Sequence, residues 1–229
     1  MQISRTKKLF PLVTADIALF TLVDWELRVL LVKRENDPAP DKWALPGGIL
    51  RPDLDSSLDE TAMRVLINKV GVEVRYLEQV TTVSGPDRDP RGWSISTAYY
   101  ALLPGELVPA VAGTTVKEIE WRSPALRGDR LAFDHGFLLQ RALAQLRMKV
   151  RHGALPLHLL PEKFTLTDVQ HACEAVLERT LDKGAFRRLI KDEPSLVILP
   201  GEFLRGPQRP AQLYQASADF RFEAEYRSE

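Results

Sequence analysis

A glycine step followed by a capped helix restricts the fold of this chain more than any other segment. Residues 44–48 form a short apolar step that ends in Gly47 and Gly48. After a polar loop, Ser57–Val70 carries apolar side chains near helical spacing, and Gly71 stands where a helix C-cap is expected. The segment therefore predicts a short apolar step into a glycine turn, followed by an amphipathic helix.

Strand patterns surround this unit. Val13–Val23 and Leu27–Lys33 are apolar runs split by residues 24–26, which is typical of a hairpin. Three further strands and a long helix are predicted at Val72–Val83, Ser94–Leu103, Glu118–Arg122 and Phe133–Val150. A strand-rich sheet with one central and one late helix predicts an α+β fold arranged as an α/β/α sandwich.

The composition shifts after Arg151, so we predict two domains, 1–150 and 151–229. In the second domain, helices are predicted over Thr167–Leu177 and Lys183–Lys191, and strands over Ser195–Leu199 and Ala211–Tyr214, with a loop over Pro200–Pro210. Two helices, a short turn between them and a basic two-stranded hairpin follow the order of a winged helix-turn-helix.

The overall composition excludes several classes of protein. The chain has 229 residues, 31 Lys and Arg against 31 Asp and Glu, and a single cysteine, Cys173. Balanced charge means that a nucleic-acid site has to be a local patch. One cysteine excludes an internal disulfide or a multi-cysteine zinc site, and we expect Cys173 to be buried. We see no signal-peptide pattern and no membrane-spanning apolar run, so a cytoplasmic protein with no membrane partner is expected.

A local basic patch lies in the second domain. Between Arg179 and Arg209 there are seven Lys and Arg against four Asp and Glu, whereas residues 151–229 together are near neutral. The predicted second helix can enter the DNA major groove, and wing arginines can reach phosphates or the minor groove. The candidate DNA-binding residues are Lys183, Phe186, Arg187, Arg188, Lys191, Arg205 and Arg209. The alternative is that these charges are the solvated faces of a small packing domain.

Residues 48–72 resemble the Nudix box, G-x5-E-x7-R-E-U-x-E-E-x-G-U, in which U is apolar. The matching residues are Gly48, Arg64, Leu66, Gly71 and Val72, with two extra residues between Gly48 and Arg64. In the box, glutamates on one helical face hold divalent cations against a substrate diphosphate, and the metal activates the attacking water. The arginine helps to fix the helix and its loop.

The carboxylates of the box are absent from this sequence. Its four glutamate positions hold Ser56, Val65, Asn68 and Lys69. Asp59 and Glu60 lie a turn or more upstream and, at about 100° per residue, point away from that face. Two loop acids, Asp53 and Asp55, make a poor magnesium site on their own. We therefore predict no catalytic residues, no metal ligands and no required cofactor.

A Nudix fold without its metal can still bind a nucleoside diphosphate. Loop 87–93 offers arginines for phosphate oxygens and a tryptophan that either stacks on a base or packs under the sheet. At the late helix, Asp134 is a cap or a ligand contact, and His135 is a surface residue or a ligand contact. Lys69 either pairs with the diphosphate or extends into solvent. The candidate ligand-binding residues are Arg34, Gly48, Lys69, Arg88, Arg91, Trp93, Asp134 and His135.

Both halves together resemble the NrtR family of Nudix-related transcriptional regulators of bacteria. The resemblance covers nearly the whole chain and is carried by DPRGWS (89–94), LAFDH (131–135), FTLTDVQ (164–170), FRR (186–188) and RPAQLY (209–214). It implies a homodimeric repressor that binds double-stranded operator DNA near genes of NAD synthesis or salvage and is released by ADP-ribose. Some relatives control sugar genes instead. Gln208 stands where many members have glycine, so the wing departs from the family pattern.

Two other functions stay open. One is a Nudix hydrolase of ADP-ribose-like nucleotides with a tethered interaction domain, and the absent glutamates argue against it. The other is a protein-binding module, since winged helices also serve as interaction domains. The arginines of the second helix and the wing argue against a pure interaction module.

Overall fold

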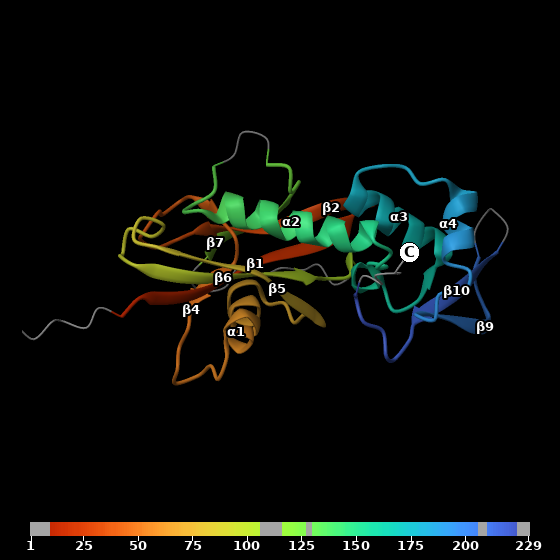
Figure 1. The fold of residues 1–229 in the computed structure, drawn as a ribbon, viewed down its shortest axis with the longest axis horizontal. Coiled ribbons are helices and arrows are strands. Elements are labelled where there is room, and N and C mark those ends of the chain that lie inside the picture. The colour runs from red at the N-terminus through yellow and green to blue at the C-terminus, as the bar shows by residue number, and fades with distance from the viewer. Residues whose placement is uncertain (1–9, 106–115, 127–129, 206–209, 224–229) are drawn as a thin grey trace, which may run out of the picture.

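The computed structural model describes residues 10–105, 116–126, 130–205 and 210–223. Figure 1 shows a large sheet with one helix on each face, followed by a smaller unit of helices and a short sheet. The first part contains β1 (Leu12–Val23), β2 (Glu26–Arg34), β3 (Trp43–Ala44), β4 (Gly47–Ile49), α1 (Leu58–Val70), β5 (Tyr76–Gly85), β6 (Ser94–Leu102), β7 (Val116–Arg122) and α2 (His135–Arg151). The predicted α+β sandwich is confirmed.

The central strand of the large sheet is β1. Within the described ranges the sheet has seven strands in the order β3-β2-β1-β6-β5, with β4 paired to β1 and β7 paired to β2. The predicted β1–β2 hairpin turns at Asp24 and Trp25, both of which have positive φ, as a tight type I′ hairpin requires. Successive side chains of β1 alternate between an apolar cluster under α1 and another under α2.

The helix α1 begins and ends where the sequence predicts. The Ser57 side chain caps its N-terminus by accepting from the Glu60 N–H, and Gly71 ends it with a left-handed backbone at φ 67°. The strand predicted from Val72 instead begins at Tyr76. Val72 and Val74 are buried in the cluster under α1, so this apolar run first serves as a core-lining connection.

The second part has the winged helix-turn-helix order. It contains a short 3-10 helix (Leu157–Leu159), β8 (Phe164–Thr165), α3 (Leu166–Leu177), α4 (Lys183–Leu189), β9 (Leu196–Leu204) and β10 (Ala211–Ala216). Among the described residues the strands form a three-stranded sheet in the order β8-β10-β9. A capping box between Thr165 and Asp168 starts α3. Cys173 is buried on the inner face of this helix, which confirms its predicted burial.

The hairpin of β9 and β10, called the wing below, corrects one prediction. The loop expected over Pro200–Pro210 is shorter, because β9 continues to Leu204 and pairs there with Ala211. Pro200 is tolerated since β9 is an edge strand, and Gly201 adopts a positive φ beside an irregularity in the pairing. The side chain of Gln212 donates to the carbonyl oxygens of Leu199 and Glu202 at 2.6 and 3.0 Å, which holds this irregular segment together.

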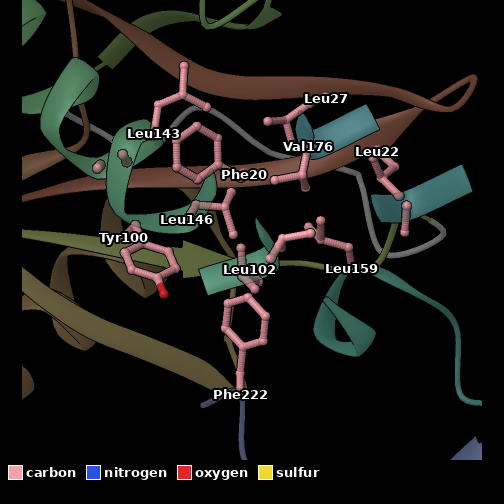
Figure 2. Packing of buried hydrophobic residues seen from close by; sticks show 14 of the residues in the cluster. Phe20, Leu22, Leu27, Tyr100, Leu102, Leu143, Leu146, Leu159, Val176 and Phe222 are labelled. Atoms are coloured by element: carbon pink, nitrogen blue, oxygen red, sulfur yellow. The ribbon is translucent and has the colours of Figure 1, made fainter. Parts of the chain in front are cut away.

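The hydrophobic core continues from the large sheet into the winged helix. Figure 2 shows Val176 of α3 beside Phe20, Leu22 and Leu27 of the β1–β2 hairpin. Phe222 returns from beyond β10 to the same cluster, and its carbonyl accepts from Lys149 of α2 at 2.8 Å. The helix α2 ends at the predicted boundary, but the two parts share one core, and a division at residues 150 and 151 stays a prediction. No helix in the described ranges is long and apolar enough to cross a membrane.

Candidate functional site

A cavity of about 700 Å³ opens beside α1 and the N-terminus of α2. Strands β1, β2 and β4, loop 86–93 and both helices contribute to its wall. Six of the sequence-predicted ligand residues line it together: Arg34, Gly48, Lys69, Arg88, Arg91 and His135. Trp93 and Asp134 do not line it. The tryptophan side chain is 50% exposed, so it packs neither into the cavity nor under the sheet.

The two glycines of β4 allow this strand to approach its neighbours closely. A Cβ atom on Gly47 would lie 1.9 Å from the Asp16 carboxylate, and one on Gly48 would lie 2.5 Å from the Val65 side chain. Any larger residue would push β4 away from β1 or from α1. The glycine step in the sequence therefore sets the width of the cavity wall.

A buried ion pair fixes the loop ahead of α1. Arg64 donates to both carboxylate oxygens of Asp55 at 2.6 Å and to the Ile49 carbonyl oxygen at 2.9 Å. The arginine holds the pKa of Asp55 well below its usual range. The family role of the arginine, fixing helix and loop, is present here. From the sequence, Asp55 and Asp53 are a poor magnesium site on their own, and the structure makes Asp55 the partner of Arg64.

The former glutamate positions present no carboxylate to the cavity. Val65 is buried against β4, while Asn68 and Lys69 line the cavity wall. Ser56 is exposed, and its backbone N–H donates to Glu60. In the described ranges no group of three or more His, Cys, Asp or Glu side chains is placed to hold a metal ion. Val65, Asn68 and Lys69 do not fit the divalent cations of a Nudix enzyme, because none of them offers a carboxylate ligand.

The arginines of the loop before β6 are held by carboxylates. Arg88 donates to both oxygens of Asp134 at 2.8 and 3.0 Å, and its guanidinium lies 4.0 Å from Asp16. Arg91 pairs in the same way with buried Asp89 at 2.7 and 3.0 Å. Asp134 occupies the N-cap position of α2 but makes no side-chain capping bond, because its carboxylate is used by Arg88. The capping interpretation of Asp134 is therefore wrong.

His135 is a buried residue rather than a surface residue. Its Nδ1 atom accepts the backbone N–H of Leu45 at 3.0 Å, so in the neutral ring the proton is on Nε2, which faces Asp16 at 3.5 Å. Burial lowers the pKa of His135 more strongly than the nearby Asp16 raises it. The ring is therefore neutral at neutral pH and presents an N–H donor at the cavity floor.

Two cations of the cavity lack a carboxylate partner in the described part of the chain. Arg34 donates to the carbonyl oxygens of Pro38 and Asn36, and its guanidinium lies 4.9 Å above the Phe133 ring. Lys69 makes no hydrogen bond or ion pair with a described residue and lines the cavity. Burial lowers the pKa of both groups, and the charge of Arg34 lowers that of Lys69 further.

Sequence reasoning missed Asp16 and Phe133, which also line the cavity. Asp16 is an acidic residue within an otherwise apolar strand. This departure from the apolar pattern is the feature of the sequence that could have identified it. It accepts hydrogen bonds from Thr14 and Ser96 and faces Arg88 and His135. Phe133 precedes α2 in the segment LAFDH, and its positive φ of 55° turns the chain ahead of the helix.

The second candidate site is the face of α4 and the wing. The Asp182 side chain caps α4, and the exposed cations there are Lys183, Arg188, Lys191 and Arg205. Phe186 is 6% exposed in the core and is corrected from a DNA contact to a residue that anchors α4. Arg187 is half-buried and donates to the Thr167 hydroxyl at 3.0 Å, which ties α4 to α3. Arg209 and Gln208 lie outside the described residues.

A Nudix-type sandwich joined to a winged helix defines the class of this protein. The chain matches the NUDIX domain over residues 14–137 and the NrtR DNA-binding winged helix domain over residues 156–216. It belongs to the NrtR family of Nudix-related transcriptional regulators.

Three comparisons, with two similar proteins, support this assignment. The ADPR responsive transcriptional repressor NtrR of Acinetobacter baylyi is 40% identical over 215 residues, which cover 93% of this chain and 85% of that protein. The crystal structure of Shewanella oneidensis NrtR with a 27mer DNA is 35% identical, with a TM-score of 0.80 over 90% of this chain and 93% of that one. The NUDIX domain of the same Shewanella protein with ADP ribose is 37% identical, with a TM-score of 0.56, and covers 63% of this chain and 94% of that one.

Proposed function

We propose that this protein is a transcriptional repressor that binds operator DNA through its winged helix and is released when its Nudix domain binds ADP-ribose. One observation carries the proposal: the cationic cavity and the winged helix share a hydrophobic core, and the helix α2 runs from one to the other. The N-terminus of α2 contributes His135 to the cavity, while at its other end Arg147 donates to the Val176 carbonyl of α3 at 3.0 Å.

The cavity supports a nucleoside diphosphate as effector. Its wall carries arginine and lysine side chains, which suit phosphate oxygens, and the Phe133 ring, which suits a base or a sugar. A polar cavity with convergent cations on rigid strands and helices is a typical small-molecule site. ADP-ribose is the effector of choice because the related Nudix domain binds it.

The winged helix supports a duplex DNA partner. The exposed cations on α4, just after it and at the end of β9 can contact the phosphates and base edges of a duplex. We propose a homodimer on a pseudo-palindromic operator, in the cytoplasm, with genes of NAD metabolism as targets. The repressor function follows that of the Acinetobacter relative.

The proposal includes the absence of Nudix hydrolysis. Ser56, Val65, Asn68 and Lys69 replace the four box carboxylates, so no side-chain set holds a metal against the diphosphate. We expect ADP-ribose to survive incubation with the protein and magnesium. Magnesium-dependent turnover on the order of 1 s⁻¹, lost on mutation of a cavity residue, would establish the hydrolase instead.

The repressor proposal is tested by selecting duplexes from a random DNA pool and measuring mobility shifts of the selected site with and without ADP-ribose. The expected result is a shifted band that ADP-ribose dissolves and that AMP, the matched control nucleotide, leaves in place. Failure to retain any duplex would overturn the DNA-binding role. A shift that is indifferent to ADP-ribose would overturn the effector role alone.

A further inference from the structure

Lys69 differs from most cations of the cavity in having no carboxylate partner among the described residues. Arg64, Arg88 and Arg91 each pair with a carboxylate at 2.6–2.8 Å. In the described part of the chain Lys69 has no such partner, and burial lowers its pKa. A half-buried ammonium without a counter-ion is costly unless a ligand supplies the charge.

The side chains of the cavity wall carry more positive than negative charge. Of the described residues that line it, six are arginine or lysine and three are aspartate or glutamate. Arg64, Arg88 and Arg91 are neutralised by their partners, and the exposed Arg51 pairs with Asp53 at 3.0 Å. Lys69 and Arg34 are left as the cations available to an anion. The carboxylate whose charge acts on Lys69 is Asp16, which is shared with Arg88 and Ser96.

Lys69 lies on the face of α1 that lines the cavity. Val65, Asn68 and Lys69 are spaced three and four residues apart, so they lie on one face of the helix. Val65 packs against β4 and thereby sets that face toward the cavity, where Asn68 and Lys69 line the wall. This is the face on which a Nudix enzyme holds its cations against the substrate diphosphate.

We propose that the Lys69 ammonium takes the place of the divalent cation, so that the cavity binds the diphosphate of its nucleotide without magnesium. The proposal rests on the proposed ADP-ribose effector. The ammonium donates to the bridging region of the diphosphate with Arg34 on the other side, and neither group can activate a water as a metal does. Retention of the nucleotide without cleavage follows from the same substitution.

Calorimetric titration of ADP-ribose into the full chain, in magnesium and in EDTA, tests the proposal. Wild type is expected to bind equally in both buffers. Lys69→Met keeps the length of the side chain and removes its charge, and the affinity is expected to fall about 10- to 100-fold, the scale of a charge-assisted hydrogen bond. Lys69→Arg keeps the charge and is expected to retain most of the affinity.

Ile67→Ala is the matched control on the same helix, because Ile67 is 50% exposed and does not line the cavity. It is expected to bind as wild type does, and circular dichroism checks that every variant folds. Binding that EDTA abolishes, or that Lys69→Met leaves unchanged, overturns the role of Lys69 and leaves the ADP-ribose effector standing. A wild type that binds no ADP-ribose in either buffer overturns the proposed effector itself.

Discussion

Most cations of the cavity are paired with carboxylates, whereas those of α4 and the wing are exposed to solvent and unpaired in the described ranges. Arg88 is 9% exposed and is held by Asp134 and Asp16, and Arg64 is fixed by Asp55. Lys183, Arg188, Lys191 and Arg205 are exposed, and none has a carboxylate partner in the described ranges. A paired, buried cation is fixed in position and contributes to the stability of the fold. An unpaired, hydrated cation adds little to stability and can adjust its position to the phosphates of DNA.

The largest expected effect is on the cavity side of this comparison. Arg88→Ala leaves the buried Asp16 and the Asp134 carboxylate without their cation, so we expect unfolding free energy to fall by about 3–5 kcal/mol. Urea denaturation measures it. Arg51→Ala is the control, because Arg51 and Asp53 are both more than half exposed, and its cost should be at most about 1 kcal/mol. Equal losses in the two variants would show that the buried pairs of Arg88 stabilise the fold no more than an exposed pair does.

A smaller effect is expected on the DNA side, and it should leave stability unchanged. Arg188→Ala is expected to weaken operator binding by about 1–3 kcal/mol if the side chain reads a guanine edge. Lys183→Ala should weaken binding to all sequences alike and reduce the slope of log affinity against log salt concentration by about 1.

Arg187→Ala differs from these two variants, because Arg187 ties α4 to α3 through Thr167. We expect it to lower the melting temperature as well as the affinity for DNA. Fluorescence anisotropy at several salt concentrations separates the three, and an unchanged affinity in the Arg188 variant contradicts the assignment of α4.

The smallest expected effect is the acid sensitivity of the loop ahead of α1. Because Arg64 depresses the pKa of Asp55, the unfolded chain binds the proton more readily than the folded chain does. The contribution of Asp55 to the free energy of unfolding is therefore fully present above its ordinary pKa of about 3.9. It is lost as the pH falls through the lower pKa of the folded state. Thermal unfolding from pH 7 downward should show Asp55→Asn less stable near neutrality and converging on wild type in acid. Asp53→Asn, at an exposed pair, should follow wild type throughout.

Much of this fold was predictable because it depends on local signals. Ser57 and Gly71 bracket α1, and Asp24 with Trp25 turns the first hairpin. These signals act within a few residues of the chain, so the sequence displays them directly. The Nudix frame without its glutamates was visible for the same reason, since the box is a local pattern. The extent of β9 was not, because its pairing with β10 outweighs the turn preference of Pro200 and Gly201.

The sequence by itself determined the order of the elements, the loss of the box carboxylates and the residues from which a cationic site is built. Only the tertiary structure decided which cation is paired and which is left for a ligand. Asp16 and Arg88 are far apart in the chain and meet because β1 and the loop before β6 lie side by side. Phe186 and Arg187 are neighbours of Arg188, yet packing against α3 turns the first into the core and the second onto Thr167. Pairing and burial depend on contacts between distant segments, and no local pattern records them.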